Sequence, residues 1–255
     1  MTFKPCIVVP VYNHGAGAAA LSEKLAPLGL PLILVNDGSE NSCRDALHAL
    51  TDQHDWVSVI DHDRNRGKGA AVLTGLRAAH ARDFTHALQI DADGQHDATD
   101  IPAFLDLAKA QKSAVIAGVP QFDDSVPKGR LVARYLTHFC VWVETLSFTI
   151  RDAMCGFRVY PLAPVIQLAA RTRLGVRMDF DPEIMVRLYW EGVPIISRPT
   201  RVTYPASGQS HFLLWRDNWL ISWMHTRLVF GMLWRVLCFR LGPGRAKPSA
   251  VRTAQ

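Results

Sequence analysis

The strongest restriction on the fold of this 255-residue chain is a regular alternation of short apolar runs and helical segments up to residue 117. The apolar runs are rich in Val, Ile and Leu, which is typical of buried strands. Strands that alternate with helices indicate an α/β fold with a mostly parallel sheet. We expect strands at 6–11, 31–35, 57–60, 85–90 and 114–117, and helices at 16–28, 43–51, 69–82 and 100–111.

The pattern is looser after residue 120, where Pro and Gly interrupt longer segments. We expect a loop at 121–129, a long helix at 130–150 and a turn with a short strand at 154–161. A helix at 182–191, a strand region at 193–204 and a loop at 205–210 follow. Residues 243–255 are expected to form a loose tail, because they combine proline and basic residues with few apolar groups.

Two carboxylates follow the apolar run 85–90 directly, at Asp91 and Asp93. Residues two apart on an extended chain point to the same side, so both side chains can face one cation. Gln95 continues the spacing and adds a neutral oxygen. Oxygen ligands of this kind suit Mg²⁺ or Mn²⁺, which often bind substrate phosphates as well. The alternative is an acidic loop that caps the next helix.

Three further polar segments follow predicted strands or open a predicted helix. Tyr12 is suited to stack on a flat base, and Asp37 to accept a hydrogen bond from a base imide. Lys68 lies between two glycines at the start of a helix, where backbone N–H groups favour anions. Ligands of open α/β sheets bind at the carboxyl ends of the strands, so these segments are expected to converge. Each also has a structural alternative, as a core tyrosine, a plain Asp-Gly turn and a plain helix start.

Taken together, these segments resemble glycosyltransferase family 2, the nucleotide-sugar-binding type with a Rossmann-like fold. The resemblance covers about residues 5–210, and within the family it is greatest to polyprenyl-phosphate (dolichol-phosphate mannose-type) glycosyltransferases. It rests on Pro10-Val11-Tyr12-Asn13, Val35-Asn36-Asp37-Gly38-Ser39, Asn65-Arg66-Gly67-Lys68-Gly69, Asp91-Ala92-Asp93-Gly94-Gln95, the segment 152–160, and Arg201 followed by Gly208-Gln209-Ser210.

The resemblance implies a GT-A nucleotide-diphospho-sugar transferase domain over 1–210, with a donor half at about 1–120 and an acceptor half at about 121–210. A metal-dependent, inverting transfer of a sugar to a lipid-linked acceptor is the implied reaction. Mg²⁺ or Mn²⁺ would be held against the donor diphosphate by Asp91, Asp93 and Gln95, with Asp93 counted among the catalytic residues. The implied nucleotide-binding residues are Pro10, Tyr12, Asn13, Asp37, Lys68 and Asp91.

The sequence departs from the family pattern on the acceptor side. Family members of this type carry an arginine after the fifth strand, where this chain has Gly118-Val119-Pro120. That phosphate contact is either missing in this chain or supplied elsewhere, by Arg130 or Arg134. The expected Ser-Lys is Ser210-His211 here. Arg158, Arg201 and Ser210 complete the predicted acceptor or phosphate residues.

A general base is needed for an alcohol acceptor, whereas a lipid phosphate is already an anion. The candidates are Asp179, Asp181 and Glu183, which lie at the start of the predicted helix 182–191. Their alternative role is to cap that helix and interact with its dipole. We favour Asp181 as an active-site residue.

The stretch 211–242 is rich in Leu, Met, Phe and Trp, but charges interrupt it, so it is not expected to span a membrane. Trp215, Trp219 and Trp223 would share one face of a helix. Nine Lys and Arg residues against one acid from residue 198 onward favour anionic lipid over nucleic acid, for which no reading module is visible. The alternatives are helices packed on the enzyme body or at a homo-oligomer contact.

Five scattered cysteines without a CxxC pair favour a reducing compartment, and no signal peptide is evident in the sequence. We therefore expect a cytoplasmic enzyme, peripheral on the cytoplasmic face of a membrane, that uses a nucleotide-diphosphate sugar and a lipid acceptor. One alternative is transfer to a hydroxyl of a glycan or another lipid. A non-enzymatic alternative is a nucleotide-sugar-binding regulatory or assembly module.

Overall fold

The computed structural model of the chain describes residues 2–122, 128–203 and 213–241. The strands are β1 (Pro5–Val11), β2 (Leu32–Asn36), β3 (Val57–Asp61), β4 (His86–Gln89), β5 (Val115–Phe122), β6 (Arg158–Pro161) and β7 (Ile195–Val202). The helices are α1 (Gly15–Leu25), α2 (Asn41–Gln53), α3 (Lys68–Ala81), α4 (Ile101–Ala110), α5 (Lys128–Thr145), α6 (Leu162–Arg171), α7 (Phe180–Trp190) and α8 (Leu214–Leu241). Short 3-10 turns follow α1 at Ala26–Leu28 and precede α4 at Ala98–Asp100.

The strands form one seven-stranded sheet in the order β3-β2-β1-β4-β6-β5-β7. The pairs β1–β2, β1–β4, β2–β3 and β5–β7 are parallel, whereas β6 runs antiparallel to both β4 and β5. Val11 pairs with Asn36, and Asn36 pairs with Asp61. The carboxyl ends of β1, β2 and β3 are therefore level at one edge of the sheet.

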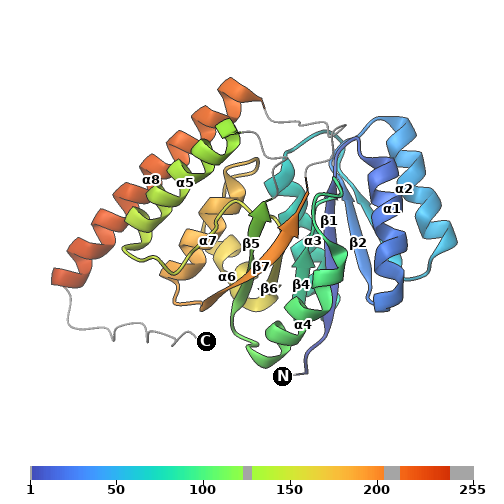
Figure 1. Cartoon of the computed structure of the whole chain (residues 1–255), viewed down its shortest axis with the longest axis horizontal. Helices are drawn as coiled ribbons and strands as arrows, with labels where there is room; N and C mark the ends of the chain where they lie inside the picture. Colours follow the sequence, from blue (N-terminus) through green and yellow to red (C-terminus); the bar gives the residue numbers. More distant parts are fainter. Residues whose placement is uncertain (1, 123–127, 204–212, 242–255) are drawn as a thin grey trace.

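Helices cover both faces of the sheet, and each face has its own apolar cluster (Figure 1). One cluster joins the sheet to α1, α2 and α4, through residues such as Leu21, Leu47 and Phe104. The other joins it to α3, α6, α7 and the two long helices α5 and α8. Two covered faces explain why the parallel strands are apolar along nearly their whole length.

The predicted α/β class with a mostly parallel sheet is confirmed, and the first five strands lie where the alternation indicated. Helix α6 was missed, because the segment after residue 161 was left unassigned. The antiparallel direction of β6 was also not predicted. Strand β5 extends to Phe122 and takes in the start of the expected loop, because its full length pairs with β7. Helix α5 ends at Thr145, five residues before the predicted end.

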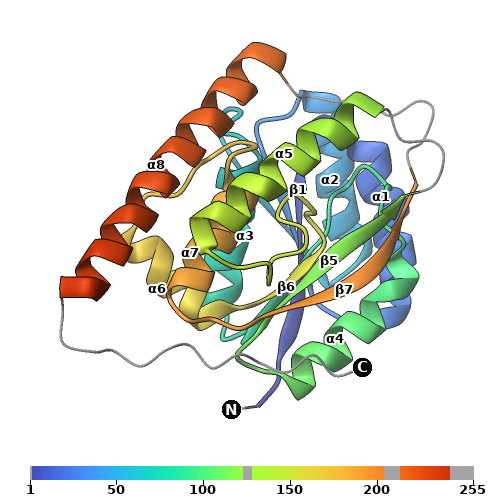
Figure 2. The same ribbon diagram turned by 60° about the vertical axis from the view of Figure 1, so that its left-hand side comes forward.

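Helices α5 and α8 lie side by side in both views of the ribbon (Figures 1 and 2). Met224 and Leu228 of α8 are fully buried in the core. Glu144 of α5 is also fully buried and lies 2.6 Å from His225 Nδ1 of α8, and burial raises the pKa of this carboxyl. The predicted C-terminal helical region is thus one continuous helix attached to the body. Within the described part of the chain, no helix is long and apolar enough to cross a bilayer.

Candidate functional site

The loops after β1 and β2 are joined at the carboxyl edge of the sheet. Asn13, whose φ of 56° is left-handed, accepts a hydrogen bond from the Glu40 N–H through its side chain at 2.9 Å. Its own backbone N–H donates to Ser39 Oγ at 3.0 Å. Asn13 thereby holds the two loops in one arrangement beside Pro10 and Tyr12. Whether these side chains contact a nucleoside stays a prediction.

Asp37 is almost fully buried and holds the loop that leads into α3. Its carboxylate accepts the backbone N–H groups of Arg66 and Gly67, both at 2.8 Å, and lies 2.8 Å from His62 Nδ1. Gly38 makes this approach possible, because a Cβ there would lie 2.2 Å from the Arg64 carbonyl carbon. Three protein donors occupy most of the acceptor capacity of Asp37, so its visible role is to shape the loop. Contact with a base stays a prediction.

A polar cleft of about 420 Å³ opens next to this loop, at the carboxyl ends of β2 and β3. Asp61 lies in its wall and accepts from Asn36 Nδ2 at 2.6 Å, with His48 Nε2 at 2.8 Å. The cleft is lined by Asn36, Gly38, Ser39, Asn41, Arg44, Asp61, His62 and Asp63. The sequence analysis did not predict Asp61 or Arg44, because neither residue lies in a motif of the family.

The centre of the site is an ion-pair cluster built from three separate elements. Lys68 opens α3, Asp91 follows β4, and Asp181 lies in the first turn of α7. Lys68 Nζ lies 2.7 Å from Asp91 Oδ2 and 3.1 Å from Asp181 Oδ2. Burial alone would lower the pKa of the lysine, but the charges of Asp181 and Asp91 outweigh it and raise that pKa. The sequence predicted all three residues, and the structure brings them together.

The backbone of Gly156 covers this cluster at close range. A Cβ at that position would lie 2.7 Å from Asp91 Oδ2 and 2.8 Å from Lys68 Nζ. A larger residue would therefore require the Asp91 carboxylate and the Lys68 ammonium to shift, whereas glycine leaves the ion pair in place. The segment 152–160 is part of the resemblance to glycosyltransferase family 2, but the sequence alone indicated no role for Gly156.

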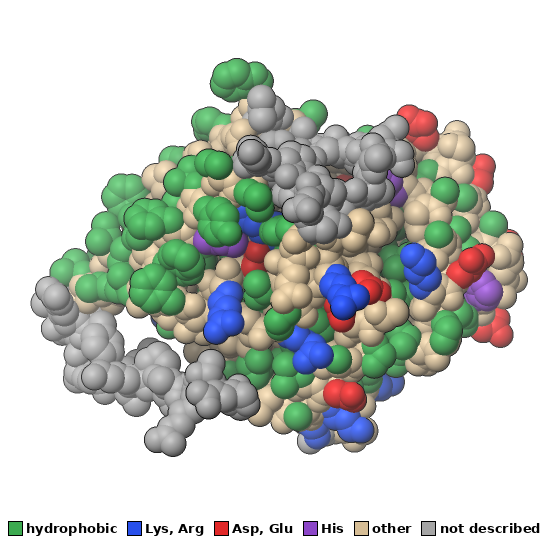
Figure 3. Space-filling model, in the orientation of Figure 1, with side chains coloured by type: hydrophobic (Ala, Val, Ile, Leu, Met, Phe, Trp, Pro, Cys, Tyr) green, Lys and Arg blue, Asp and Glu red, His purple; other side chains and the backbone are tan. Residues whose placement is uncertain are grey.

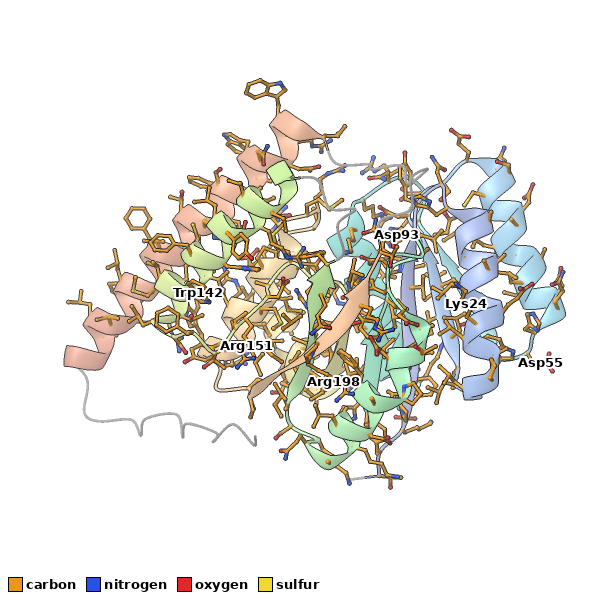
Figure 4. All side chains as sticks on the ribbon, viewed as in Figure 1. Lys24, Asp55, Asp93, Trp142, Arg151 and Arg198 are labelled. Carbon is orange, nitrogen blue, oxygen red and sulfur yellow. The ribbon has the colours of Figure 1, made fainter. Side chains whose placement is uncertain are left out.

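Asp91, Asp93 and Gln95 lie at the end of the central strands, where Figure 4 labels Asp93. The three side chains line one small cavity. Asp91 Oδ1 is buried, and no described residue hydrogen-bonds to it. Burial and the Asp91 charge raise the pKa of Asp93.

These oxygens fit a divalent cation. A bound cation would satisfy the orphaned oxygen and offset the repulsion between the two carboxylates. No cluster of three or more His, Cys, Asp or Glu side chains suited to a metal occurs in the described ranges. Two carboxylates and one amide would leave coordination positions for ligands from a substrate.

Arg134 of α5, which was predicted to bind the acceptor phosphate, lies at the same cavity. Arg134 Nε donates to Asp152 Oδ2 at 2.6 Å, and its guanidinium lies over the Phe122 ring, 5.1 Å from the centroid. Arg134 and Pro120 line the same cavity of about 90 Å³ as Asp91 and Asp93. Pro120 belongs to the segment that lacks the arginine of the family pattern, and Arg134 is one of the two residues suggested to replace that arginine. Both residues line this cavity.

Asp152 organises this side of the site. Its Oδ1 accepts the backbone N–H groups of Met154 and Cys155 at 2.8 and 2.7 Å. Its Oδ2 also lies 3.3 Å from His138 Nε2. Burial would raise the pKa of Asp152, but the His138 hydrogen bond and the Arg134 charge hold it well below its usual range. Neither Asp152 nor His138 was predicted; the position of Asp152 before a Cys-Gly-Phe-Arg string was the only available signal.

The structure places Arg158, which was predicted to bind an acceptor or phosphate, away from the surface of the site. Its side chain is fully buried beneath the site. Its guanidinium donates to Ala153 O at 2.7 Å, Asp181 O at 2.9 Å and Tyr160 OH at 3.0 Å. Arg158 therefore connects the segment before β6 to the start of α7.

The other predicted acceptor residues lie elsewhere or cannot be placed. Arg201 is exposed on β7, and its backbone N–H donates to Asp100 at 3.2 Å; its neighbour Val202, which points to the opposite face, lines the cavity instead. The side chain of Arg201 therefore lies on the outer face of the strand, and its acceptor role stays a prediction. Ser210 lies outside the described residues, as does the side chain of Arg130. His96, in contrast, was not predicted but lines the cavity and stacks on Phe157 at 5.4 Å.

Comparison with known proteins gives the same family as the sequence motifs. The sequence profile of glycosyl transferase family 2 matches residues 6–169. A dolichyl-phosphate β-glucosyltransferase of Drosophila melanogaster is 29% identical over 209 residues, covering 70% of this chain and 60% of the relative. A UDP-N-acetylglucosamine–dolichyl-phosphate N-acetylglucosaminyltransferase of Methanococcus voltae is 28% identical over 184 residues, covering 66% of this chain and 73% of the relative. The chain thus spans about three fifths of the length of the insect relative.

A solved structure shares the fold at low sequence identity. The glucosyl-3-phosphoglycerate synthase of Mycobacterium tuberculosis, crystallised with Mn²⁺, UDP-glucose and phosphoglyceric acid, superposes with a TM-score of 0.61 and 15% identity. The match covers 91% of this chain and 79% of that protein. At this identity the likeness shows the fold alone.

Proposed function

The chain belongs to glycosyl transferase family 2, and on this basis we propose that it transfers a sugar from a nucleoside-diphosphate sugar to a lipid-linked phosphate. The observation that carries the proposal is the cavity that Asp91, Asp93 and Gln95 line together with Arg134. A donor diphosphate and an acceptor anion would meet there. The names of the two dolichyl-phosphate relatives support the choice of acceptor.

On the donor side, Asp91, Asp93 and Gln95 would hold Mg²⁺ or Mn²⁺, with Asp93 essential for turnover. The ion would supply neutralisation of the charge that develops on the leaving nucleoside diphosphate. Lys68, at the N-terminus of α3, would bind a diphosphate oxygen together with backbone N–H groups. Pro10, Tyr12, Asn13 and the loop held by Asp37 would surround the nucleoside.

On the acceptor side, Arg134 would bind the phosphate of the lipid, and Asp152 would hold the guanidinium in position. A phosphate monoester is already ionised near neutral pH, so attack on the anomeric carbon needs no general base. Direct attack opposite the leaving diphosphate inverts the anomeric centre. Asp181 would then serve to position Lys68 and the backbone around the reacting groups.

Transfer to a hydroxyl is the second candidate, and Asp181 is the observation that favours it. Its Oδ1 is buried and accepts no hydrogen bond from any residue that the structure describes. A carboxylate oxygen that accepts no hydrogen bond and lies beside the proposed reaction centre would take the proton of an alcohol, even with the Arg158 guanidinium 3.7 Å away. A polyprenyl phosphate and the corresponding polyprenol, offered as separate acceptors, distinguish the two reactions: only the phosphate should be glycosylated under our proposal.

We also propose that the protein works at the cytoplasmic face of a membrane, docked through α5 and α8. Exposed apolar side chains gather over these two helices in Figure 3. Those of α5 are Val132, Tyr135, Leu136 and Phe139, and those of α8 include Trp215, Trp219, Trp223, Phe230 and Trp234. Tryptophans beside basic residues are typical of helices in a lipid interface. Arg134 lies on the same helix as four of these side chains, so a lipid phosphate would reach it directly from the surface.

The test is a donor screen with lipid extract, in which radiolabel from UDP- or GDP-sugars is followed into the organic phase. We expect Mg²⁺- or Mn²⁺-dependent transfer. Asp93→Ala should lower it by about 10²–10³-fold, the range for loss of a transition-state electrostatic stabiliser. Asp106→Ala, a change of an exposed aspartate on α4, is the matched control and should retain activity. Failure to bind or hydrolyse any such donor would contradict the proposal.

A further inference from the structure

The position of Lys68 raises a question about how a cation enters the site. Its ammonium lies 2.7 Å from Asp91 Oδ2, the carboxylate that the proposed function assigns to the metal. An ammonium on Asp91 Oδ2 and a divalent ion on Asp91 Oδ1 would repel each other strongly, because both are desolvated and share one carboxylate. Lys68 in this position therefore competes with metal.

The surroundings leave the ammonium few alternatives within the protein. Asp181 Oδ2, at 3.1 Å, is its second partner, and the side chain of Asp181 is about 6% exposed. The backbone of Gly156 covers the pair so closely that a Cβ there would lie 2.7 Å from Asp91 Oδ2 and 2.8 Å from Lys68 Nζ. An anionic ligand from outside is thus the natural third partner, and Lys68 opens a helix whose N–H groups also favour anions.

We propose that Lys68 is an internal counter-ion: it neutralises Asp91 and Asp181 until a nucleoside diphosphate draws its ammonium away, so that metal binds together with the donor. The inference rests on the proposed donor site and adds an order of events to it. With Lys68 and Arg158 as cations and Asp91, Asp93 and Asp181 as anions, the buried cluster has one excess negative charge. A divalent ion alone would reverse that charge, whereas an ion with a diphosphate would restore it.

Release of Lys68 has a second consequence at Asp181. Once the ammonium contacts the diphosphate, Asp181 loses its nearest cation and retains only Arg158, whose Nη1 lies 3.7 Å from Asp181 Oδ1. Donor binding would therefore change the charge that an acceptor meets. Lys68 is a positioning residue in this scheme, linking the donor and acceptor sides through one side chain.

The test measures Mn²⁺ binding to the whole chain by the loss of the free-ion EPR signal, without nucleotide and with UDP or GDP. Wild type should bind Mn²⁺ weakly alone and at least tenfold more tightly with the nucleoside diphosphate that it recognises. Lys68→Gln should bind Mn²⁺ alone at least tenfold more tightly than wild type and lose most of the nucleotide effect. Lys68→Arg keeps the charge and should behave as wild type. Lys109→Gln, an exposed lysine on α4, is the surface control.

If Lys68→Gln does not fold, the double change Lys68→Met with Asp181→Asn retains the net charge of the cluster and should give the same gain in Mn²⁺ affinity. Unchanged Mn²⁺ affinity in these variants, with nucleotide-dependent binding intact in wild type, would overturn the counter-ion role and leave the proposed function standing. No Mn²⁺ binding by wild type with either nucleotide would overturn both.

Discussion

Asp152 is the residue whose ionisation we expect to matter most for the free energy of unfolding. Its carboxylate is about 3% exposed and holds Arg134, His138 and two backbone N–H groups. Removal of the charge leaves the arginine buried without its carboxylate, which typically costs about 3–5 kcal/mol. We expect Asp152→Asn to lower the free energy of unfolding by about 3 kcal/mol, as measured by urea denaturation at pH 7.

The difference in the free energy of unfolding between wild type and Asp152→Asn depends on pH, and the pKa of Asp152 determines its direction. The pKa of Asp152 is lower in the folded protein than the value of about 3.9 for an unfolded chain. The carboxylate therefore stabilises the fold fully above about pH 5, and the contribution is lost as the pH falls through the folded pKa. The gap between wild type and Asp152→Asn should be constant between pH 5 and 7 and narrow below pH 4. A gap that widens on acidification would contradict this assignment.

Gly156 tests whether close approach of the backbone to the ion pair is needed. Alanine would put a methyl group 2.7 Å from Asp91 Oδ2, so either the carboxylate or the segment has to shift. We expect Gly156→Ala to weaken nucleotide-dependent Mn²⁺ binding by about tenfold or more, while the melting temperature changes by only a few degrees. Titration calorimetry and thermal unfolding of the same samples provide the two measurements. Unchanged Mn²⁺ binding would show that the segment can move away.

For single residues, the sequence predicted which side chains belong to the site but not how they are oriented. Lys68, Asp91 and Asp181 come from three separate strings, and the sheet and the start of α7 bring them within contact distance. Arg158 was assigned to a ligand because it lies in a recognised string, yet its guanidinium is used by backbone carbonyls. A string identifies the neighbourhood of a side chain, whereas only tertiary packing decides whether it points to a cavity or to the core.

Helix α8 packs on the body of the protein, and in our proposal it also docks on a membrane. Two kinds of substitution separate these roles. Trp219 and Trp223 are 65% and 51% exposed, with stacked rings 6.3 Å apart. Changing both to Ser should leave the melting temperature unchanged and reduce binding to vesicles with anionic lipid by about tenfold or more, since each indole contributes a large apolar area. Co-sedimentation with vesicles measures the effect, and equal binding would refute the interfacial role.

Met224 lies on the opposite side of α8 and is fully buried. Met224→Ala should lower the free energy of unfolding by about 2–5 kcal/mol through loss of packing and the cavity left behind. Vesicle binding of the folded fraction should not change. Deletion of the whole helix would remove both contributions at once, so it cannot isolate a membrane role.

The elements that sequence reasoning missed have a common physical cause. Helix α6 is short, begins directly at the end of β6 and contains a proline in its first turn, so no turn signal separates it from the strand. Strand β6 has only four residues, all buried, and its direction depends on partners more than 30 residues away. Periodicity reports burial of a segment but carries no information about the direction of its neighbours.

At the scale of the whole molecule, the proposed donor and acceptor halves do not form separate sheets. Strand β5 belongs to the first 122 residues, yet its partners among the described strands are β6 and β7 alone. A fragment of residues 1–120 would leave β5 without any strand partner. We expect that fragment to show no cooperative unfolding transition by circular dichroism, and the full chain to show a single one. A cooperative melt of the fragment would contradict this view.

The antiparallel strand β6 also determines when the sheet can be completed during synthesis. The chain leaves the ribosome from its N-terminus, so β4 is available long before residues 158–161 exist. Until then, one edge of β4 presents unpaired backbone groups in an apolar segment, the kind of edge at which chains associate wrongly. The nascent protein is therefore prone to aggregation while the edge of β4 is unpaired, and pairing with the four-residue strand β6 removes that exposed edge.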